Sequence, residues 1–268
     1  MQIALTIAGS DSGGGAGIQA DLKAFARAGV HGTTAITAIT AQNTVGVLAV
    51  EAVSPGMVVE QVRAVVEDIG VQAVKIGMLG SVATTEAVAR ALDLVPAGTP
   101  VVLDPVMVAE SGARLLDPDA QRALVERLLP RATVATPNVA EASQLSGTGA
   151  EQDLEALARA VHALGPANVV VTGGHRTDAT DLLFDGDRLV ELPGPRHADG
   201  AAHGSGCTHS STLAARLALG DDLESAAREA KRVASEAVRD GLREIGRGAG
   251  PVDVLCLAEH ARRRASGL

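Results

Sequence analysis

The sequence contains neither tryptophan nor tyrosine, and its two phenylalanines are Phe25 and Phe184. A flat ligand therefore cannot be held by stacking on tryptophan or tyrosine. Cysteine is scarce as well, and Cys207 and Cys256 form no CxxC or Cys/His pattern of the kind that structural zinc sites use. We expect both thiols to be reduced in an intracellular protein.

Positive charge is a third shortage. Three lysines stand against twenty arginines, and a net charge of −9 argues against nucleic acid or an anionic membrane surface as partners. An anionic ligand would need local positive potential from a helix N-terminus, an arginine or a divalent metal ion. Residues 1–9 lack the basic start of a signal peptide, and no apolar run reaches the length of a membrane span. We therefore expect a cytoplasmic protein.

Apolar strands and amphipathic helices alternate along most of the chain. The pattern predicts a three-layer α/β/α sandwich with a central, mostly parallel sheet, a late β-hairpin and a helical C-terminus, all in a single domain of residues 1–268. Strands are expected at residues 3–8, 33–40, 73–78, 101–106, 131–136 and 168–172, and the hairpin at 182–184 and 188–192. Helices are expected at residues 18–26, 54–68, 138–145, 154–164, 210–219, 222–243 and 252–264.

Polar or glycine-rich clusters follow several of these strands. They occupy residues 9–17, 41–44, 77–78, 104–105 and 172–175. Ligands of such sheets bind beyond the carboxyl ends of the strands, so these clusters predict a binding site along one rim.

A glycine-rich stretch at residues 203–208 runs into the helix expected at 210–219. Small residues at a helix start leave backbone N–H groups open to a ligand, and the helix dipole favours an anion there. Cys207 lies in this stretch, where the dipole could lower its pKa and supply a thiolate beside a bound phosphate. The same residues also fit a glycine-rich helix cap with a buried, inert cysteine.

The first glycine loop, residues 13–17, is a poor nucleotide signature. It lacks the Lys-Ser/Thr ending of a P-loop. Residues 15–20 match the G-x-G-x-x-A dinucleotide pattern, but no acidic residue stands between Leu22 and Val50 to bind a ribose. A dinucleotide oxidoreductase is thus a weak alternative, and a tight strand-to-helix turn explains the glycines equally well.

Eight short motifs are distributed along nearly the whole chain. They are AGSDSGGGAGIQAD at 8–21, AQNT at 41–44, KIGML at 75–79, LDPVM at 103–107, TPNVAE at 136–141, GGH at 173–175, HGSGCT at 203–208 and GRGAGPV at 246–252. Taken together, these motifs resemble those of the hydroxymethylpyrimidine/phosphomethylpyrimidine kinases of thiamine biosynthesis, which belong to the ribokinase-like superfamily. The resemblance implies ATP-dependent phosphorylation of 4-amino-5-hydroxymethyl-2-methylpyrimidine and of its monophosphate, with Mg²⁺, in an enzyme that is often a homodimer.

The resemblance places the substrate pocket at Gly9, Asp21, Gln42, Met78 and Val106. Gln42 could pair its amide with the aminopyrimidine edge, and Met78 and Val106 could pack on the ring faces. Without the resemblance, Met78 and Val106 would pass for core residues, and Asp21 for part of a solvated helix face.

On the nucleotide side, the resemblance makes Asp104 and Glu141 metal-binding residues. Asn138 and Glu141 would share a helix face, but they also fit an ordinary capping pair after Pro137. The residues expected to bind ATP are Asn138, Thr172, Gly174 and Ser205.

For catalysis, the resemblance implies an anion hole and a base. Gly204, Ser205, Gly206 and Cys207 would present backbone N–H groups to the transferring phosphoryl group. Cys207 would accept the proton of the substrate's CH₂OH group. The second reaction has a phosphate acceptor, which needs no deprotonation, so Cys207→Ala should impair the first reaction more than the second.

The sequence departs from the family at two places. Relatives commonly carry lysine where Thr172 stands, and Asn-Thr where residues 201–202 are Ala-Ala. We expect Arg176 or a second cation to supply the lost positive charge. The histidines at 175, 203 and 209 are expected to be structural.

Two other functions stay open. Pyridoxal kinase shares the superfamily fold, although Gln42 and Met78 favour the pyrimidine. A non-catalytic pyrimidine- or nucleotide-binding sensor would keep the pocket but lose the metal-binding residues, which this sequence retains.

Overall fold

The computed structural model of the chain describes residues 1–109, 112, 115–148, 153–174, 179–198 and 200–265. Its main sheet has eight strands in the order β10-β9-β8-β7-β6-β5-β1-β2. Six neighbouring strands are parallel to one another: β8, β7, β6, β5, β1 and β2. At one edge, β9 is antiparallel to both of its neighbours, β8 and β10. The strands are β1 (Ile3–Ala8), β2 (His31–Ile36), β5 (Ala73–Ile76), β6 (Val101–Leu103), β7 (Val134–Ala135), β8 (Val169–Val171), β9 (Asp181–Phe184) and β10 (Leu189–Leu192).

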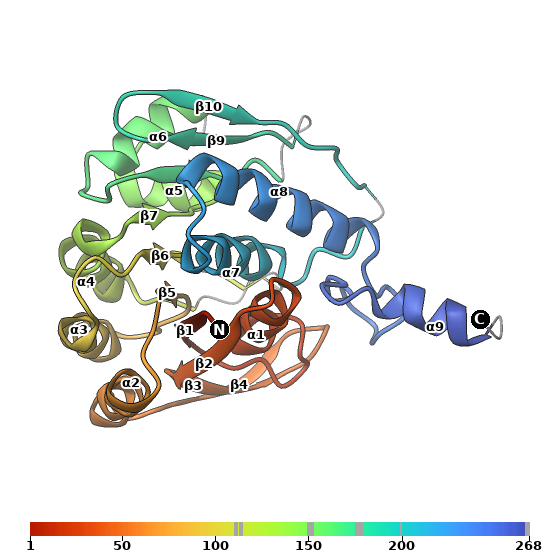
Figure 1. Cartoon of the computed structure of the whole chain (residues 1–268), viewed down its shortest axis with the longest axis horizontal. Helices are drawn as coiled ribbons and strands as arrows, with labels where there is room; N and C mark the ends of the chain where they lie inside the picture. The colour runs from red at the N-terminus through yellow and green to blue at the C-terminus, as the bar shows by residue number, and fades with distance from the viewer. Residues whose placement is uncertain (110–111, 113–114, 149–152, 175–178, 199, 266–268) are drawn as a thin grey trace.

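Helices cover both faces of this sheet (Figure 1). One layer contains α1 (Gly17–Arg27), α7 (Ser205–Ala218) and α8 (Leu223–Arg239). The other contains α2 (Pro55–Asp68), α3 (Val82–Ala91), α4 (Pro118–Arg127), α5 (Val139–Ser146) and α6 (Leu154–His162). The expected three-layer α/β/α architecture is confirmed.

Alternation along the strands explains the two layers. In β1, Leu5 and Ile7 join the core beneath α2, α3 and α4, whereas Ala4 joins the core beneath α1, α7 and α8. Successive side chains of a strand point to opposite faces, so nearly every residue of a central strand is buried. This is why the central strands read as continuous apolar runs.

The single strand expected at residues 33–40 is wrong, because these residues belong to two strands in different sheets. The chain leaves the main sheet at Thr37, whose hydroxyl donates to the Met78 carbonyl at 2.7 Å. It then forms β3 (Ala38–Gln42), which pairs with β4 (Val47–Ala52), a strand that the sequence pattern did not predict. The register shifts at Ala41 and Gln42, and such a bulge turns a side chain away from the regular alternation.

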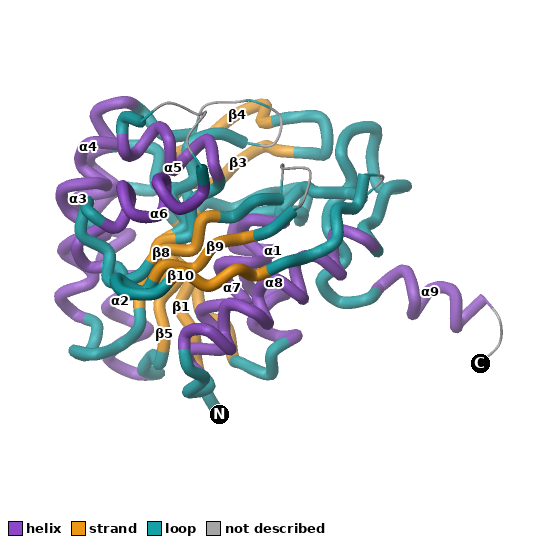
Figure 2. The backbone as a smooth tube through the Cα atoms, turned by 90° about the horizontal axis from the view of Figure 1, so that it is seen from above, coloured by secondary structure: helices purple, strands orange, loops and turns teal. Residues whose placement is uncertain are grey.

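The C-terminal helices also differ from expectation. Helix α7 begins at Ser205, five residues earlier than expected, because Gly204 adopts a left-handed φ of +86° and ends the preceding loop. Helix α8 ends at Arg239, and α9 (Leu257–Ala265) begins later than expected and extends away from the body (Figures 1 and 2). The segment between them packs against α1 and α8 through Val252 and Val254, and the Val252 amide donates to the His203 carbonyl.

Among the described residues, no helix combines the length and the apolar character needed to cross a membrane.

Candidate active site

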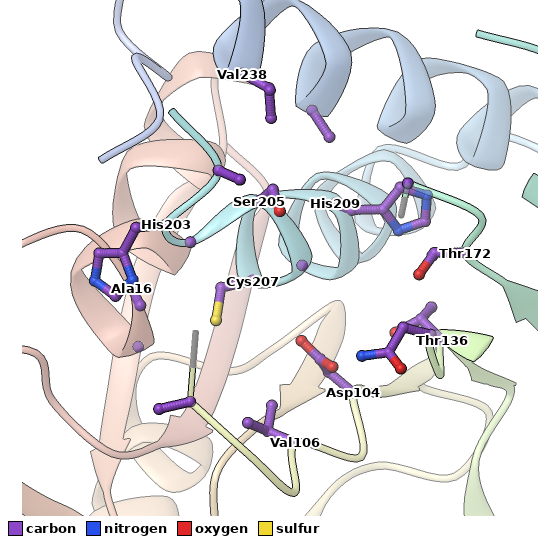
Figure 3. A pocket seen from close by; sticks show the side chains of 18 of the residues that line it. Ala16, Asp104, Val106, Thr136, Thr172, His203, Ser205, Cys207, His209 and Val238 are labelled. Carbon is purple, nitrogen blue, oxygen red and sulfur yellow. The ribbon is translucent and has the colours of Figure 1, made fainter. Parts of the chain in front are cut away.

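A cavity of about 400 Å³ opens at the carboxyl ends of the parallel strands, beside the start of α7. Each of the polar clusters predicted along the rim contributes to its wall, through Gly9, Gln42, Met78, Asp104 and Thr172. Its far end reaches α8, where Val238 lines the wall (Figure 3). The parallel sheet therefore brings residues from distant parts of the sequence to one site.

Nearly all of the predicted site residues line this cavity, and Asp21 is the exception. Those in the wall are Gly9, Gln42, Met78, Asp104, Val106, Asn138, Glu141, Thr172, Gly174, Gly204, Ser205, Gly206 and Cys207.

Asp21 lies behind the cavity, fully buried. Its carboxylate accepts hydrogen bonds from Thr6 Oγ1 and Ser211 Oγ, both at 2.6 Å, and from Lys75 Nζ at 3.0 Å. A solvated helix face is thus excluded for this residue. With its acceptors used by the protein, Asp21 is placed to orient Lys75 rather than to touch a ligand.

Lys75 is the buried cation of the site, and its side chain is fully buried although it lines the cavity. Burial opposes its charge, but Asp21, Cys207 and Asp104 outweigh that effect and raise its pKa, so the ammonium group stays charged. Its Nζ atom lies 4.0 Å from Asp104 Oδ2. The sequence did hold a signal for this residue, since a lysine inside an apolar strand requires a buried partner.

The first turn of α7 offers two free amides. The Ser205 amide, expected to face the ligand, instead donates to the Ala202 carbonyl at 3.0 Å. In the described part of the chain, the amides of Gly206 and Cys207 donate to no backbone oxygen. Backbone donors at a helix N-terminus are suited to an anion, so Gly206 and Cys207 form the anion-binding end of the cavity.

The expected lowering of the Cys207 pKa is wrong. Burial raises the pKa of this thiol to about 12; Lys75 opposes the increase, whereas the carboxylates of Asp21 and Asp104 add to it. An amide hydrogen bond from Gly17 also favours the thiolate, but does not offset burial. The thiol is therefore protonated at neutral pH in the unliganded protein.

A buried Asp–His pair connects the two glycine-rich loops. Asp11 accepts hydrogen bonds from the amides of Gly13, Gly15 and Ala16 at 2.8 to 3.0 Å and lies 2.8 Å from His203 Nε2. Burial alone would raise the Asp11 pKa, but these hydrogen bonds lower it, so the carboxylate is ionised. The loops are in close contact, because a Cβ atom on Gly204 would lie 1.7 Å from the Gly15 carbonyl oxygen.

Three side chains form the flank of the cavity next to β1. Gln42 reaches the wall from the bulge in β3, and Met78 and Val106 follow β5 and β6. Gly9 allows Met78 to approach, since a Cβ atom there would lie 3.1 Å from the Met78 sulfur. An amide beside a thioether and a branched aliphatic group suits a flat, polar-edged ring.

Asp104 and Glu141 are two buried carboxylates in the same wall. Burial raises the pKa of Asp104, against the effects of Lys75 and the Ser210 hydroxyl, which donates at 2.9 Å. Burial and the Asp104 charge raise the pKa of Glu141 to about 8. Glu141 also forms the capping box with Asn138 that the sequence allowed. Two desolvated carboxylates that repel each other fit a divalent cation.

No cluster of three or more histidine, cysteine or acidic side chains that could hold a metal ion occurs among the described residues. Mg²⁺ is commonly held by one or two carboxylates together with water and substrate phosphates. Asp104 and Glu141 therefore suit Mg²⁺ better than a metal that requires a complete protein cage.

The opposite flank of the cavity, next to β8 and β9, contains residues that the sequence did not single out. Lys231 Nζ donates to Asp181 Oδ1 at 2.7 Å, and the Gly173 amide donates to the same oxygen at 2.8 Å. Thr172, Gly174 and His209 line the same flank. Lys231 also lines the wall, but its charge is paired with Asp181, so the replacement of the lost lysine by a second cation stays a prediction. His175 and Arg176 lie outside the described residues.

Comparison with known proteins gives a consistent result. Residues 11–253 match the family profile described as Phosphomethylpyrimidine kinase. The hydroxymethylpyrimidine/phosphomethylpyrimidine kinase of Rhizobium meliloti is 52% identical over 256 residues, which cover 93% of this chain and 96% of that protein. The ADP complex of Bacillus subtilis pyridoxal kinase superposes with a TM-score of 0.87 at 38% identity, covering 96% of this chain and 99% of that one. A phosphomethylpyrimidine kinase from Clostridium difficile gives a TM-score of 0.78 at 39% identity, covering 89% and 100%.

Proposed function

Because the chain belongs to the phosphomethylpyrimidine kinase family, we propose that the cavity at the start of α7 is its active site. The protein is an ATP-dependent kinase of thiamine biosynthesis that phosphorylates 4-amino-5-hydroxymethyl-2-methylpyrimidine and then its monophosphate. The observation that supports this site best is the position of the free Gly206 and Cys207 amides in one cavity with the Asp104 and Glu141 carboxylates.

Gln42, Met78 and Val106 bind the pyrimidine in this proposal. The amide of Gln42 pairs with the aminopyrimidine edge, and the other two side chains pack on the ring. This places the CH₂OH group beside Cys207, at the free amides of α7. Asn138, Thr172, Gly174 and Ser205 then contact ATP on the other side.

In the transfer step, the substrate hydroxyl oxygen bonds to the γ-phosphorus while the bond from that phosphorus to the β-phosphate bridging oxygen breaks, and ADP leaves. The Gly206 and Cys207 amides stabilise charge on the transferring oxygens. Asp104 and Glu141 would hold Mg²⁺, which neutralises phosphate charge when it is bound.

Cys207 accepts the hydroxyl proton in the first reaction. Its thiol must first lose a proton to solvent, and Lys75 reduces the cost of forming the thiolate. The monophosphate is already an anion, so the second reaction proceeds without this base. The two reactions therefore share the anion-binding end and differ in their need for Cys207.

We also propose a homodimer that uses the β3–β4 hairpin. Leu48 is 75% exposed, Ile39 57% and Val50 49%, an apolar surface that a second copy of the chain would cover. Both cysteines are unpaired, which supports a reducing compartment such as the cytoplasm.

The test is ADP release from Mg-ATP with three acceptors: hydroxymethylpyrimidine, its monophosphate and pyridoxal. Turnover of both pyrimidines is expected. Pyridoxal is included because pyridoxal kinases superpose on this chain with TM-scores up to 0.87. Turnover of pyridoxal alone would overturn the pyrimidine assignment, and no turnover of any acceptor would overturn the kinase assignment.

A further inference from the structure

His209 is a buried histidine whose ring has no hydrogen-bonding partner in the part of the chain that the structure describes. Its side chain lines the cavity and the residue is 4% exposed. Neither ring nitrogen is hydrogen-bonded to any described residue. Asp181 Oδ2 lies 3.5 Å from Nε2, which is too far for a good hydrogen bond. Buried polar side chains rarely lack partners, so the ring is suited to a ligand that enters the cavity.

Among the described residues, the charged groups around the ring come from two elements. Asp181 faces it from β9, and Lys231 faces it from α8, while Thr172 after β8 is uncharged. Asp181 and Lys231 pair with each other at 2.7 Å and largely cancel. Burial lowers the pKa of His209, so the ring is neutral and offers one N–H donor and one bare nitrogen.

The position of His209 relative to Cys207 indicates which ligand it meets. The two residues lie on opposite flanks of the first turns of α7, with Cys207 toward Val106 and His209 toward Thr172 (Figure 3). In phosphoryl transfer, the attacking oxygen and the leaving oxygen lie roughly in line on opposite sides of the phosphorus. If the acceptor lies on the Cys207 flank, the leaving phosphates lie on the His209 flank.

We propose that His209 binds the phosphate chain of the nucleotide, with its ring N–H donating to a non-bridging oxygen of the departing diphosphate. This inference rests on the proposed active site. It does not depend on which acceptor is phosphorylated.

Protonation of the ring follows as a consequence. An adjacent phosphate favours the imidazolium form, because the Asp181 and Lys231 charges already neutralise each other. Nucleotide binding should therefore take up a proton at His209. Affinity for ADP should rise as the pH falls from 8 to 6.

The experiment is isothermal titration of ADP, AMP and adenosine into the wild type, His209→Leu and His209→Gln. His209→Leu should weaken ADP binding about 10- to 100-fold, the range expected for loss of a hydrogen bond to a charged group. Adenosine should bind nearly unchanged, and His209→Gln, which keeps an N–H donor, should retain part of the ADP affinity. His260→Leu, in exposed α9, is the matched control and should behave as the wild type.

A second readout is the pH dependence of ADP binding. The wild type should gain more affinity between pH 8 and pH 6 than His209→Gln, and the comparison cancels the titration of ADP itself. If His209→Leu does not fold, His209→Gln alone tests the proposal through this difference.

Equal losses for adenosine and ADP in His209→Leu would assign the ring to the nucleoside or to the fold and overturn the proposal. Unchanged ADP affinity would overturn it as well. Failure of the wild type to bind ADP would overturn the proposed kinase site itself, which is a different outcome.

Discussion

The two flanks of the cavity differ in how completely their polar groups are satisfied. On the flank next to β1, Asp11, Asp21, Lys75 and His203 all have hydrogen-bonding partners within the protein. On the flank next to β8 and β9, the ring nitrogens of His209 have none among the described residues. The charged side chains of the first flank are therefore held in place by the protein itself, whereas the His209 ring on the second flank is held by no hydrogen bond to the described residues.

This difference separates stability from affinity. A buried polar group without a partner lowers the stability of the folded state by about 1–3 kcal/mol. Removing one member of a hydrogen-bonded buried pair introduces this cost, because the remaining member loses its partner. Substitutions on the β1 flank should thus lower the free energy of unfolding. Substitutions of His209 should change nucleotide affinity with little effect on folding.

Lys75→Met gives the largest expected effect. It leaves the Asp21 carboxylate buried beside Thr6 and Ser211 without its cation, so the free energy of unfolding should fall by about 3–5 kcal/mol. Urea unfolding measures this change. Lys75→Met combined with Asp21→Asn removes both charges and should recover much of the stability but not the turnover. A free energy of unfolding equal to that of the wild type in the single variant would show that the hydrogen bonds on the β1 flank do not stabilise the fold.

Cys207→Ala tests the chemistry on the same flank. It should slow phosphorylation of the alcohol by about 10²–10⁴-fold and phosphorylation of the monophosphate much less, because only the alcohol needs a base. Steady-state rates with each acceptor measure the ratio. Cys256→Ala, the other free cysteine, is the matched control. Equal losses with both acceptors would exclude the base role.

The pH dependence of the wild type follows from the same residue. The pKa of Cys207 is raised to about 12, so the thiol is protonated below that value and the thiolate fraction grows about tenfold per pH unit. The alcohol reaction should therefore accelerate between pH 7 and pH 10, while the monophosphate reaction stays nearly flat. Parallel profiles for the two acceptors would argue against proton transfer to Cys207.

His203→Ala should have a smaller effect. It removes one of the hydrogen bonds to Asp11 and loosens the contact between the two glycine-rich loops, at a cost of about 1–3 kcal/mol. Thermal unfolding measures the loss, with His260→Ala as control. Turnover of both acceptors should fall to a similar extent, since both use the same loops. A loss confined to one acceptor would contradict a purely positional role.

The Asp11–His203 pair also predicts acid sensitivity. The folded pKa of Asp11 lies below its ordinary value of 3.8, so its contribution to stability is present above that pH and is lost as the pH falls through the folded value. Asp11→Asn should flatten this part of the stability profile. An unchanged slope below pH 4 would show that other groups control acid unfolding.

His209→Leu should have the smallest effect on folding. It removes a buried ring without partners, so the free energy of unfolding should change by less than about 1 kcal/mol. Urea unfolding of this variant beside Lys75→Met compares the two flanks directly. A loss as large as that of Lys75→Met would remove the distinction between them.

Apolar runs and helical periodicity predicted the layers and most of the sheet, because central strands such as β1 are buried on both faces and are therefore apolar along their length. The sequence pattern did not predict β4 or the break at Thr37, because the spacing of apolar residues does not show where the chain passes from one sheet to another. It also placed the start of α7 too late. The first turn of this helix consists of small and polar residues after Gly204, which give no apolar spacing to recognise.

The site was predicted less evenly. The segments singled out by motif resemblance line one cavity, but Asp21 lies behind Lys75 instead of in the wall. The Cys207 pKa moved in the opposite direction from the helix-dipole expectation, because burial depends on three-dimensional packing that spacing cannot reveal. His209 was expected to be structural, because the lack of a hydrogen-bonding partner among the described residues is visible only in the three-dimensional structure.

The bulge in β3 has a consequence for how this enzyme could change its acceptor. Gln42 lies on a two-stranded appendage outside the main sheet, whereas Cys207, Asp104 and Glu141 lie on its helices and strand ends. In the proposed pocket, Met78 and Val106 follow strands of the main sheet, so the hairpin supplies one of the three ring contacts. Substitutions in the hairpin would then change the contact to the ring edge at Gln42 and leave the strand ends and helices that carry Cys207, Asp104 and Glu141 in place.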